Sequence, residues 1–500
     1  MPETGQPVLT EALLAPHFAE RPAVQADTLI LSYAQLRGRV ASTINQLRSA
    51  GVDSGDRVLV LCPNGTGHII AVLAVIACGA IAVPLDPAAK AGRLRDATRQ
   101  TRPRCCLVEN EAAAPAGIKA LRLSSNSDMA GHTTVALATI SPDQPALIRF
   151  TSGSSGHAKG VVLTQTQQLW TASRLARAFG LDSRHRELVL LTMSSSGGWQ
   201  RVAATLLVGG CVIIGEPPLS IGSLLDDIVA TRATGFFTPP PLVRMLLAAP
   251  ADRVRKALLD CRNIEIGSAA LSTTELNTFL PLVPNARVFV HYGLTECSRA
   301  AILDTRAHPD RVNTVGTALP GVTNSIRDED GNDLPAGLPG EIHLRSPHLA
   351  TGYWEQPDLN QRFVNGWLAT GDHGHLDADG FLTLLGRHDD LINCGGHCYF
   401  PAEVEQLLGT PSGVEQYLVA GVADPRGVLQ EVPWAFVVPI DATSWTPEAF
   451  LALARGNLPG HMVPRHVVTV PRLPLTASGK PDRLETVKLY AATQEVSPDG

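Results

Sequence analysis

The chain has 500 residues, which at roughly 100–200 residues per domain allows about two to four domains. With 44% hydrophobic and 18% charged residues, its composition is that of a globular protein and excludes a largely disordered chain. The net charge of −6 provides no basic surface for a nucleic acid, so we expect no nucleic-acid partner.

The nine cysteines follow neither a disulfide pattern nor a zinc-binding pattern. Cys105 and Cys106 are adjacent, and Cys394 and Cys398 lack the second pair that a zinc site needs. We therefore expect reduced thiols and a cytoplasmic location.

The N-terminus has no basic start followed by an apolar core, so we expect no signal peptide. The longest apolar stretch, Ile69 to Leu85, is shorter than the roughly 20 residues that span a bilayer. It predicts a buried helix, a turn at Gly79 and a buried strand that ends at Pro84. We therefore expect no membrane span.

Helical and strand-like segments alternate through the first part of the chain. Apolar residues at helical spacing predict a helix from Ala34 to Ala50, which stops at Gly51. Short β-rich runs predict strands at Arg57–Leu61, Ile81–Leu85, Leu147–Thr151, Leu188–Thr192, Cys211–Ile214 and Arg287–His291. This alternation favours α/β layers with mostly parallel sheets.

The pattern changes from about Pro320, where turn dipeptides such as Asp379-Gly380 separate short strands and indicate an antiparallel, β-rich lobe. After Arg387 comes a last segment of about 110 residues, the length of a small α+β domain. We expect a helix at 401–409 and strands at 417–422 and 434–439. A domain boundary is predicted near Asp389.

The strongest local motif is Leu147-Ile-Arg-Phe-Thr-Ser-Gly-Ser-Ser-Gly-His-Ala-Lys-Gly160. A β-rich run leads into a loop where Gly153 and Gly156 let backbone N–H groups converge on an anion, and Lys159 adds a positive charge. Because Gly160 follows Lys159, the spacing is not that of a Walker loop, which argues against a P-loop NTPase or kinase. Taken alone, the segment is equally well a Ser/Gly turn.

Lysine is rare in this chain, since only six of its 41 lysine and arginine residues are lysines. Two of the six, Lys159 and Lys480, stand next to glycine in loop-like segments. An arginine-rich chain that keeps lysine at these positions favours a need for a compact ammonium group there, although chance remains an alternative.

Five segments together resemble the signatures of the adenylate-forming superfamily, the AMP-dependent synthetases and ligases that include acyl-CoA synthetases, luciferases and the adenylation domains of peptide synthetases. They span residues 147 to 483, in the order found in that family. The segments are Thr151–Gly160, His291–Glu296, Gly366–Asp372, Gly386–Gly396 with its continuation Pro401–Glu405, and Thr476–Lys480.

The resemblance implies an α/β fold with a large multilayer N-terminal domain, residues 1–388, and a small mobile α+β C-terminal domain, residues 389–500. The large domain would combine two packed, mostly parallel sheets, their helices and a β-rich lobe, and would hold the ATP and acyl sites. The small domain would be a lid that carries the catalytic lysine. The implied reaction forms an acyl-adenylate from an acid and ATP, and then transfers the acyl group to a thiol.

The resemblance also implies a role for each matching residue. Thr295 would contact the α-phosphate, Glu296 would bind Mg²⁺, Lys480 would stabilise charge during adenylation, and Asp389 would be the hinge. The residues implied in ATP binding are Thr151, Ser152, Gly153, Ser154, Ser155, Gly156 and Lys159 for the phosphates, Gly267, Ala269 and Tyr292 for adenine, and Asp372 and Arg387 for ribose.

Several of these segments have a plainer interpretation that the sequence leaves open. Gly267-Ser-Ala-Ala270 is also what a strand-to-helix turn looks like, Thr295-Glu296 could begin a helix, and Thr370-Gly371-Asp372 could be a simple turn. Three positions depart from the family pattern: Ala158 and Pro481 beside the two lysines, and Cys398 where some acyl-CoA synthetases have arginine.

Of the expected sites, the acyl-binding pocket has the weakest sequence signal. In the family it is lined partly by the segment equivalent to Met193–Arg201. Ser196 stands near the place where amino-acid-activating relatives have an aspartate, which disfavours a free α-amino acid. The Pro239-Pro-Pro241 turn, near the expected pocket wall, could shorten the pocket, and we expect a small or medium aliphatic or aromatic acid. The candidate pocket residues are Ser196, Trp199, Gln200, Arg201 and Arg299. Arg299 could bind a second carboxylate or be ion-paired.

We therefore expect an AMP-forming carboxylic acid ligase that uses ATP and Mg²⁺. Coenzyme A and the phosphopantetheine arm of a separate carrier protein are both open as acceptors. The alternatives are an amide synthetase of the same fold, an amino-acid-activating enzyme, and a non-catalytic homologue. Release of AMP and pyrophosphate, instead of ADP and phosphate, would separate the ligase from a kinase.

Overall fold

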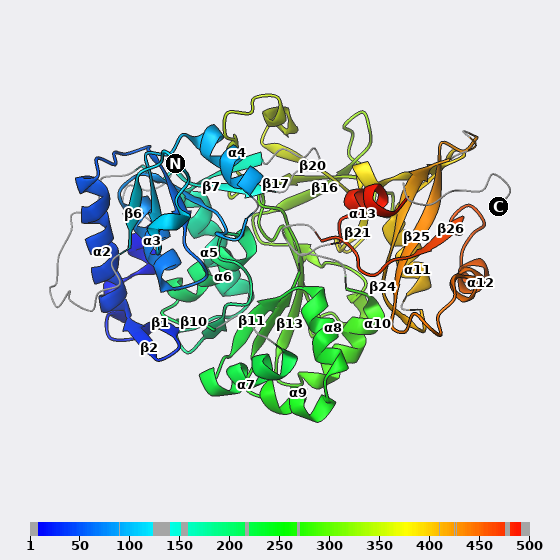
Figure 1. The fold of residues 1–500 in the computed structure, drawn as a ribbon, viewed down its shortest axis with the longest axis horizontal. Helices are drawn as coiled ribbons and strands as arrows, with labels where there is room; N and C mark the ends of the chain where they lie inside the picture. Colours follow the sequence, from blue (N-terminus) through cyan, green and yellow to red (C-terminus); the bar gives the residue numbers. More distant parts are fainter. Residues whose placement is uncertain are drawn as a thin grey trace.

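The computed structural model describes most of the chain (Figure 1). The described residues are 9–89, 91–123, 141–151, 159–215, 220–267, 271–409, 411–424, 426, 428–475 and 481–491. They form mixed helices and strands, with the N-terminal two thirds at one side of the molecule and the C-terminal segment at the other (Figure 1). Within the described residues, no helix is long and apolar enough to cross a membrane.

The first sheet has seven strands in the order β18-β8-β7-β4-β3-β5-β6. Strands β7, β4, β3, β5 and β6 run parallel, whereas β8 and β18 are added antiparallel at one edge. The strands are β3 (Arg57–Leu61), β4 (Ile81–Pro84), β5 (Cys105–Val108), β6 (Ala120–Arg122), β7 (Pro145–Thr151), β8 (Lys159–Thr164) and β18 (Gly352–Tyr353).

The second sheet has nine strands in the order β15-β14-β13-β12-β11-β9-β10-β1-β2, with parallel pairing from β1 to β13. Its strands are β1 (Pro22–Ala26), β2 (Leu29–Ser32), β9 (Arg186–Leu188), β10 (Cys211–Ile214), β11 (Gly235–Thr238), β12 (Asn263–Ile266), β13 (Arg287–Tyr292), β14 (Ala301–Asp304) and β15 (Thr317–Ala318).

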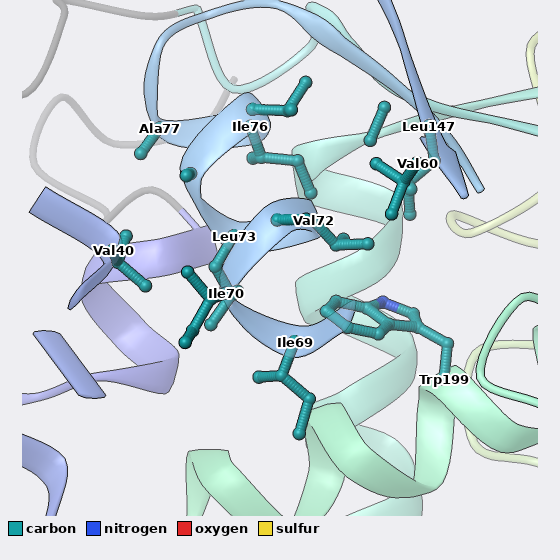
Figure 2. Packing of buried hydrophobic residues seen from close by; sticks show 14 of the residues in the cluster. Val40, Val60, Ile69, Ile70, Val72, Leu73, Ile76, Ala77, Leu147 and Trp199 are labelled. Atoms are coloured by element: carbon teal, nitrogen blue, oxygen red, sulfur yellow. The ribbon is translucent and has the colours of Figure 1, made fainter. Parts of the chain in front are cut away.

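The helices of this region are α1 (Leu9–Leu13), α2 (Tyr33–Ser49), α3 (Thr66–Ala77), α4 (Ala91–Thr101), α5 (Gln165–Ala178), α6 (Ser196–Leu207), α7 (Ile221–Thr231), α8 (Pro240–Ala248), α9 (Ala251–Ala257) and α10 (Thr273–Phe279). Every residue of helix α3 from His68 to Ala77 is buried, as expected for a helix whose residues from Ile69 to Ala77 are all apolar. Figure 2 shows Ile69 and Val72 of α3 close to Trp199 of α6. This packing joins the helices between the sheets into one core.

The third sheet is antiparallel and has the order β16-β17-β20-β19, with β21 paired to β20. Its strands are β16 (Thr323–Arg327), β17 (Gly340–Arg345), β19 (Phe363–Val364), β20 (Trp367–Leu376) and β21 (Leu382–Arg387). The C-terminal segment comprises β22 (Ile392–Cys394), β23 (His397–Tyr399), α11 (Pro401–Leu408), β24 (Val414–Ala423), β25 (Glu431–Pro439), α12 (Pro447–Asn457), β26 (His466–Thr469) and α13 (Arg483–Tyr490).

This architecture confirms the predicted fold class and most of the predicted elements. The helix expected from Ala34 to Ala50 is α2, which begins after a Ser32 capping box and ends before Gly51 at φ 78°. The apolar stretch from residue 69 is the predicted helix, turn and strand.

One predicted strand, Leu188–Thr192, is wrong in its position, because β9 ends at Leu188. Beyond it, the side chain of Asn64 forms the hydrogen bonds that a neighbouring strand would have supplied. Its amide donates to the carbonyl of Leu191 at 2.8 Å and accepts from the N–H of Met193 at 2.8 Å. The chain is thereby guided out of the sheet toward α6.

Two buried histidines make stability depend on pH. Burial lowers the pKa of His68 and of His348 to about 4, against about 6.5 in an unfolded chain. Between these values the unfolded state binds protons that the folded state does not, so stability is full above about pH 6.5 and falls as the pH drops. We expect a loss of about 2 kcal/mol per histidine at pH 5, measured as a lower thermal unfolding midpoint than at pH 7.

A matched pair of variants checks the cause of this pH dependence. His348→Gln keeps an amide donor for the carbonyl of Ser298, which lies 2.8 Å from Nε2 of His348, and should remove about half of the decline between pH 7 and 5, because His68 remains. His17→Gln replaces an exposed histidine and should leave the decline unchanged. An unfolding midpoint that stays constant from pH 7 to 5 would contradict the prediction.

Candidate active site

The candidate site begins where two neighbouring parallel strands end. Strand β12 ends at Ile266, just before Gly267, and β13 ends at Tyr292. The two strands are paired in register, with Ile266 opposite Val290. A Cβ atom on Gly267 would lie 2.1 Å from the His291 ring, so only glycine fits beside that side chain. The carboxyl end of a parallel sheet is a common place for ligand binding in α/β folds.

Asp372 connects this edge to the antiparallel sheet. The Tyr292 hydroxyl donates to Oδ2 of Asp372 at 2.7 Å, and burial, followed by the nearby Asp372 carboxylate, raises the pKa of Tyr292 well above its usual value. Arg387 stands opposite Asp372 in the β20–β21 ladder, with Nε 3.5 Å from Oδ1. The structure therefore brings together three residues predicted to hold adenosine: an aromatic ring, a carboxylate and a guanidinium.

Glu296 lies beyond the end of β13, and Thr295 precedes it. Residues 295–300 form bends and turns, so the alternative of a helix starting at Thr295 is wrong. The Glu296 side chain is buried, and its backbone carbonyl accepts from the N–H of Ala350 at 2.8 Å. Its Oε1 accepts a hydrogen bond from the Tyr353 hydroxyl at 2.6 Å. The carboxylate is thus held in a defined position.

Lys159 is the first residue of strand β8 and lies close enough to Glu296 for the two charges to interact. Partial burial lowers its pKa, and so does the positive charge of Arg362 and Arg387, while Glu296 and Asp389 act in the opposite sense. Two further cations and two carboxylates therefore lie near Lys159. Such a group suits a polyphosphate, which carries several negative charges and a bound cation.

Two residues of this neighbourhood, Tyr353 and Arg362, were not predicted from the sequence. Tyr353 is buried on the short edge strand β18, and Arg362 ends a turn of 3₁₀-helix at Leu359–Arg362. The Arg362 Nη1 donates to the Tyr353 hydroxyl at 3.1 Å. Neither belongs to one of the five matching segments. Tyr353 reaches Glu296 from the edge of the first sheet, and Arg362 lies against β20 of the third sheet.

Seven predicted site residues lie outside the described residues: Ser152, Gly153, Ser154, Ser155, Gly156, Ala269 and Lys480. Their roles remain predictions from the resemblance. The described residues on either side, Thr151 and Lys159, face each other in the β7–β8 pairing and place the two ends of the phosphate loop together.

The candidate acyl-pocket residues differ in how far their side chains are buried. Ser196 is the first residue of α6, after Ser195, whose side chain caps the helix. Trp199 is fully buried in the core beside Ile69 (Figure 2), and Gln200 donates to the side chain of Gln168 at 2.9 Å. Around Trp199 and Gln200 the structure shows core packing, and their assignment to a pocket remains a prediction.

Arg201 and Arg299 belong to a buried ion-pair cluster. Arg299 binds Glu265 through two hydrogen bonds, Nε to Oε1 at 2.9 Å and Nη2 to Oε2 at 3.1 Å. Arg201 donates from Nε to Glu187 at 2.8 Å. His291 Nδ1 lies 2.8 Å from Oε1 of Glu265. Of the two interpretations left open for Arg299, ion pairing is the one that the structure shows.

The carboxylate that could hold a metal is Glu296. Within the described residues, no group of three or more His, Cys, Asp or Glu side chains could hold a metal ion by itself. This donor set fits Mg²⁺, which is usually bound by one or two carboxylates together with substrate phosphates and water. It does not fit a zinc site, which needs a closed set of nitrogen and sulfur ligands.

Comparison with known proteins identifies the family of this chain. The family model described as "AMP-binding enzyme" matches residues 14–354, and the one described as "AMP-binding enzyme C-terminal domain" matches residues 403–480. The feruloyl-CoA synthase of an Amycolatopsis species is 32% identical over 482 residues, which cover 94% of this chain and 95% of that protein.

Two solved structures are similar over nearly their whole length. ATP-bound MatB from Rhodopseudomonas palustris superposes with a TM-score of 0.88 at 26% identity, covering 96% of this chain and 98% of that one. The amide bond synthetase McbA from Marinactinospora thermotolerans has a TM-score of 0.86 at 28% identity, covering 96% and 99%. The chain therefore belongs to the AMP-binding enzyme family, the adenylate-forming superfamily, and is an ATP-dependent, AMP-forming acid–thiol ligase.

Proposed function

We propose that this ligase joins a small carboxylic acid to coenzyme A with ATP and Mg²⁺. In the first step the carboxylate attacks the α-phosphate of ATP, pyrophosphate leaves and an acyl-adenylate forms. In the second step a thiolate attacks the acyl carbon and AMP leaves. The observation that supports this best is the convergence of Tyr292, Asp372 and Arg387 with Glu296 and Lys159.

We assign each of these residues, and Lys480 from the C-terminal motif, a task in that reaction. Tyr292 and Asp372 would hold adenosine, and Arg387 would contact the ribose. Lys159 offers positive charge to the β- and γ-phosphates, and Thr295 offers a hydroxyl to the α-phosphate. Glu296 is the carboxylate for Mg²⁺, which when bound would neutralise phosphate charge. Lys480 then stabilises the charge that develops on the α-phosphate as the acid attacks.

We propose coenzyme A as the acceptor because the feruloyl-CoA synthase is similar over nearly the whole chain. The likeness to McbA favours a second candidate, an amide synthetase in which an amine captures the adenylate. A phosphopantetheine arm on a separate carrier protein is the third possible acceptor. The nine free cysteines support a reducing compartment, and we propose the cytoplasm.

The acid is proposed to be small or medium in size and to lack an α-amino group. Ser196 at the start of α6 offers no charge to an ammonium group. Arg299 and Arg201 are already paired with buried glutamates, so neither guanidinium is available to a second substrate carboxylate without breaking an ion pair. This favours an acid with an apolar or neutral polar tail over a dicarboxylic acid.

Acid-dependent pyrophosphate release with ATP and Mg²⁺ tests the proposal, across aliphatic, aromatic, dicarboxylic and amino acids. Trapping with hydroxylamine reports the acyl-adenylate itself. For the acid that responds, coenzyme A, a phosphopantetheinylated carrier and an amine are then added separately. Thioester with coenzyme A is the expected product. Amide without thioester would favour the second candidate, and no pyrophosphate with any acid would contradict the proposal.

The division of the chain into residues 1–388 and 389–500 is also a proposal. Asp389 lies in a turn of 3₁₀-helix, His388–Asp390, between the antiparallel sheet and the C-terminal segment. The first family model ends at residue 354 and the second begins at residue 403, so Asp389 lies between the two matched regions. We propose that the C-terminal segment turns about Asp389 between the two half-reactions.

Replacing Asp389 by proline should slow thioester formation and leave adenylation intact. Proline fixes φ near −65°, so the backbone could no longer rotate at the hinge. The measurement compares pyrophosphate release with thioester formation for the same acid. Asp389→Ala is the control, because it removes the carboxylate and keeps the rotation. Overall turnover equal to that of the wild type in Asp389→Pro would remove the reason for placing the hinge there.

A further inference from the structure

Glu296 is held by a chain of hydrogen-bond donors that begins outside the signature segments. The Arg362 Nη1 donates to the Tyr353 hydroxyl at 3.1 Å, and the Tyr353 hydroxyl donates to Oε1 of Glu296 at 2.6 Å. Tyr353 is only 3% exposed and Glu296 only 6% exposed, so little water competes for these groups. A donor chain of this kind, charged at its start and at its end, is strong because each bond polarises the next.

The protonation state of the Tyr353 hydroxyl fits its role as the donor to Glu296. The ordinary pKa of a tyrosine hydroxyl is about 10. The hydroxyl therefore stays protonated at neutral pH and remains a donor to Glu296. Because its Oε1 is already occupied by the tyrosine, Glu296 keeps Oε2 as the oxygen that can accept a cation.

Tyr353 is fixed by its backbone as well as by its hydroxyl. It lies on β18, where Gly352 and Tyr353 pair with Val162 and Val161 of β8, the strand that Lys159 begins. The Tyr353 N–H also donates to Oδ1 of Asn360 at 2.6 Å. The position of the ring is thus set by the same strand that carries the phosphate-binding lysine.

Arg362 is fixed on its other side by the strand that carries Asp372. Its Nε donates to the carbonyl of Ala369 at 2.9 Å, and its Nη2 donates to the carbonyl of Thr370. Arg362 therefore binds β20 just before Asp372 and, through Tyr353, reaches Glu296. One guanidinium connects the ribose-binding side of the site to the metal-binding side.

We propose that Tyr353 and Arg362 are positioning residues that orient Glu296 for Mg²⁺ and hold it in register with Asp372. This rests on the proposed function, in which Glu296 serves Mg²⁺ and Asp372 serves the ribose. Neither residue needs to touch the nucleotide for this role. Groups that orient a metal ligand typically change metal affinity by about 10–100-fold when they are removed.

The test measures nucleotide binding by calorimetry, with ATP and Mg²⁺ and with ATP and EDTA. Tyr353→Phe removes the hydroxyl and keeps the ring. We expect it to weaken binding of ATP in the presence of Mg²⁺ by about 10–100-fold, and to leave binding in EDTA within about twofold of the wild type. The Mg²⁺ concentration that half-saturates binding should rise by a similar factor.

Two further variants separate positioning from general damage. Tyr33→Phe is the matched control, because it removes another buried hydroxyl, which donates to the carbonyls of Leu206 and Gly210 far from Glu296 in sequence. It should not change the dependence on Mg²⁺. Arg362→Lys keeps the positive charge but cannot bond Ala369, Thr370 and Tyr353 together, and it should reproduce part of the loss.

The outcomes are distinct. The inference would be overturned if Tyr353→Phe weakened ATP binding equally with and without Mg²⁺, or did not weaken it at all. If Tyr353→Phe does not fold, the same two binding measurements are made on Arg362→Lys, and the same results would overturn the inference. The measurement uses no acid and no acceptor. Failure of the proposed function would instead appear as a wild-type protein that binds ATP with Mg²⁺ but releases no pyrophosphate with any acid.

Discussion

Lys480→Ala is expected to slow acyl-adenylate formation by about 10²–10³-fold. The reason is electrostatic: the attack of the acid builds negative charge on the α-phosphate oxygens, and a positioned ammonium group is the donor that the C-terminal motif supplies. Capture of a chemically supplied acyl-adenylate by the thiol should proceed at the wild-type rate, since that step needs no charge at the same place. Single-turnover pyrophosphate release and thioester formation measure the two steps separately.

Lys488 provides the control for this substitution. It lies exposed on α13, eight residues further along, and Lys488→Ala should leave both half-reactions unchanged. If Lys480→Ala slowed thioester formation from the supplied adenylate as much as adenylation, the lysine would have a structural role or serve both steps. The role assigned here would then be wrong.

Glu265→Gln is expected to cause the largest loss of stability, about 3–5 kcal/mol of the free energy of unfolding. Glu265 is fully buried, and burial alone would raise its pKa, but Arg299 and His291 hold it well below the usual value. The neutral side chain would leave the buried guanidinium of Arg299 without its counter-charge. The measurement is the urea concentration at the unfolding midpoint, or the thermal midpoint.

An exposed ion pair offers the comparison. Asp226 and Arg253 are 3.0 Å apart, with side chains 74% and 49% exposed, so Asp226→Asn should cost no more than about 1 kcal/mol. Removing both partners of the buried pair, in Glu265→Gln with Arg299→Gln, should recover part of the loss, because no unpaired charge remains. Equal midpoints for Glu265→Gln and Asp226→Asn would contradict the prediction.

The segments assigned to the phosphates and to adenosine stand out in the sequence because their signals are local. Glycines, hydroxyls and one lysine stand within a few residues of each other between Thr151 and Lys159, and the carboxylate of Asp372 ends a short motif of its own. The strand at Leu188–Thr192 was misplaced for the opposite reason. Its hydrogen-bond partner is Asn64, which lies more than a hundred residues earlier and carries no β-strand signal.

Which charged side chains form ion pairs could likewise not be predicted from the sequence pattern. Arg299 could have faced the substrate or a buried carboxylate, and its neighbours in the chain do not distinguish the two. Its partner, Glu265, lies on strand β12, whereas Arg299 lies in the turn that follows β13, the strand paired with β12. The desolvation of both groups then makes the pair obligatory.

By itself, the sequence determined the family, the order of the nucleotide-binding motifs and the class of reaction, because each motif carries its chemistry within about ten consecutive residues. The tertiary structure alone decided how the motif residues are oriented. Tyr353 and Arg362 reach Glu296 only because β18 joins the edge of the first sheet and β20 passes beside it. Hydrogen bonds between distant segments depend on sheet order and register, which are set by packing over the whole chain and leave no local pattern in the sequence.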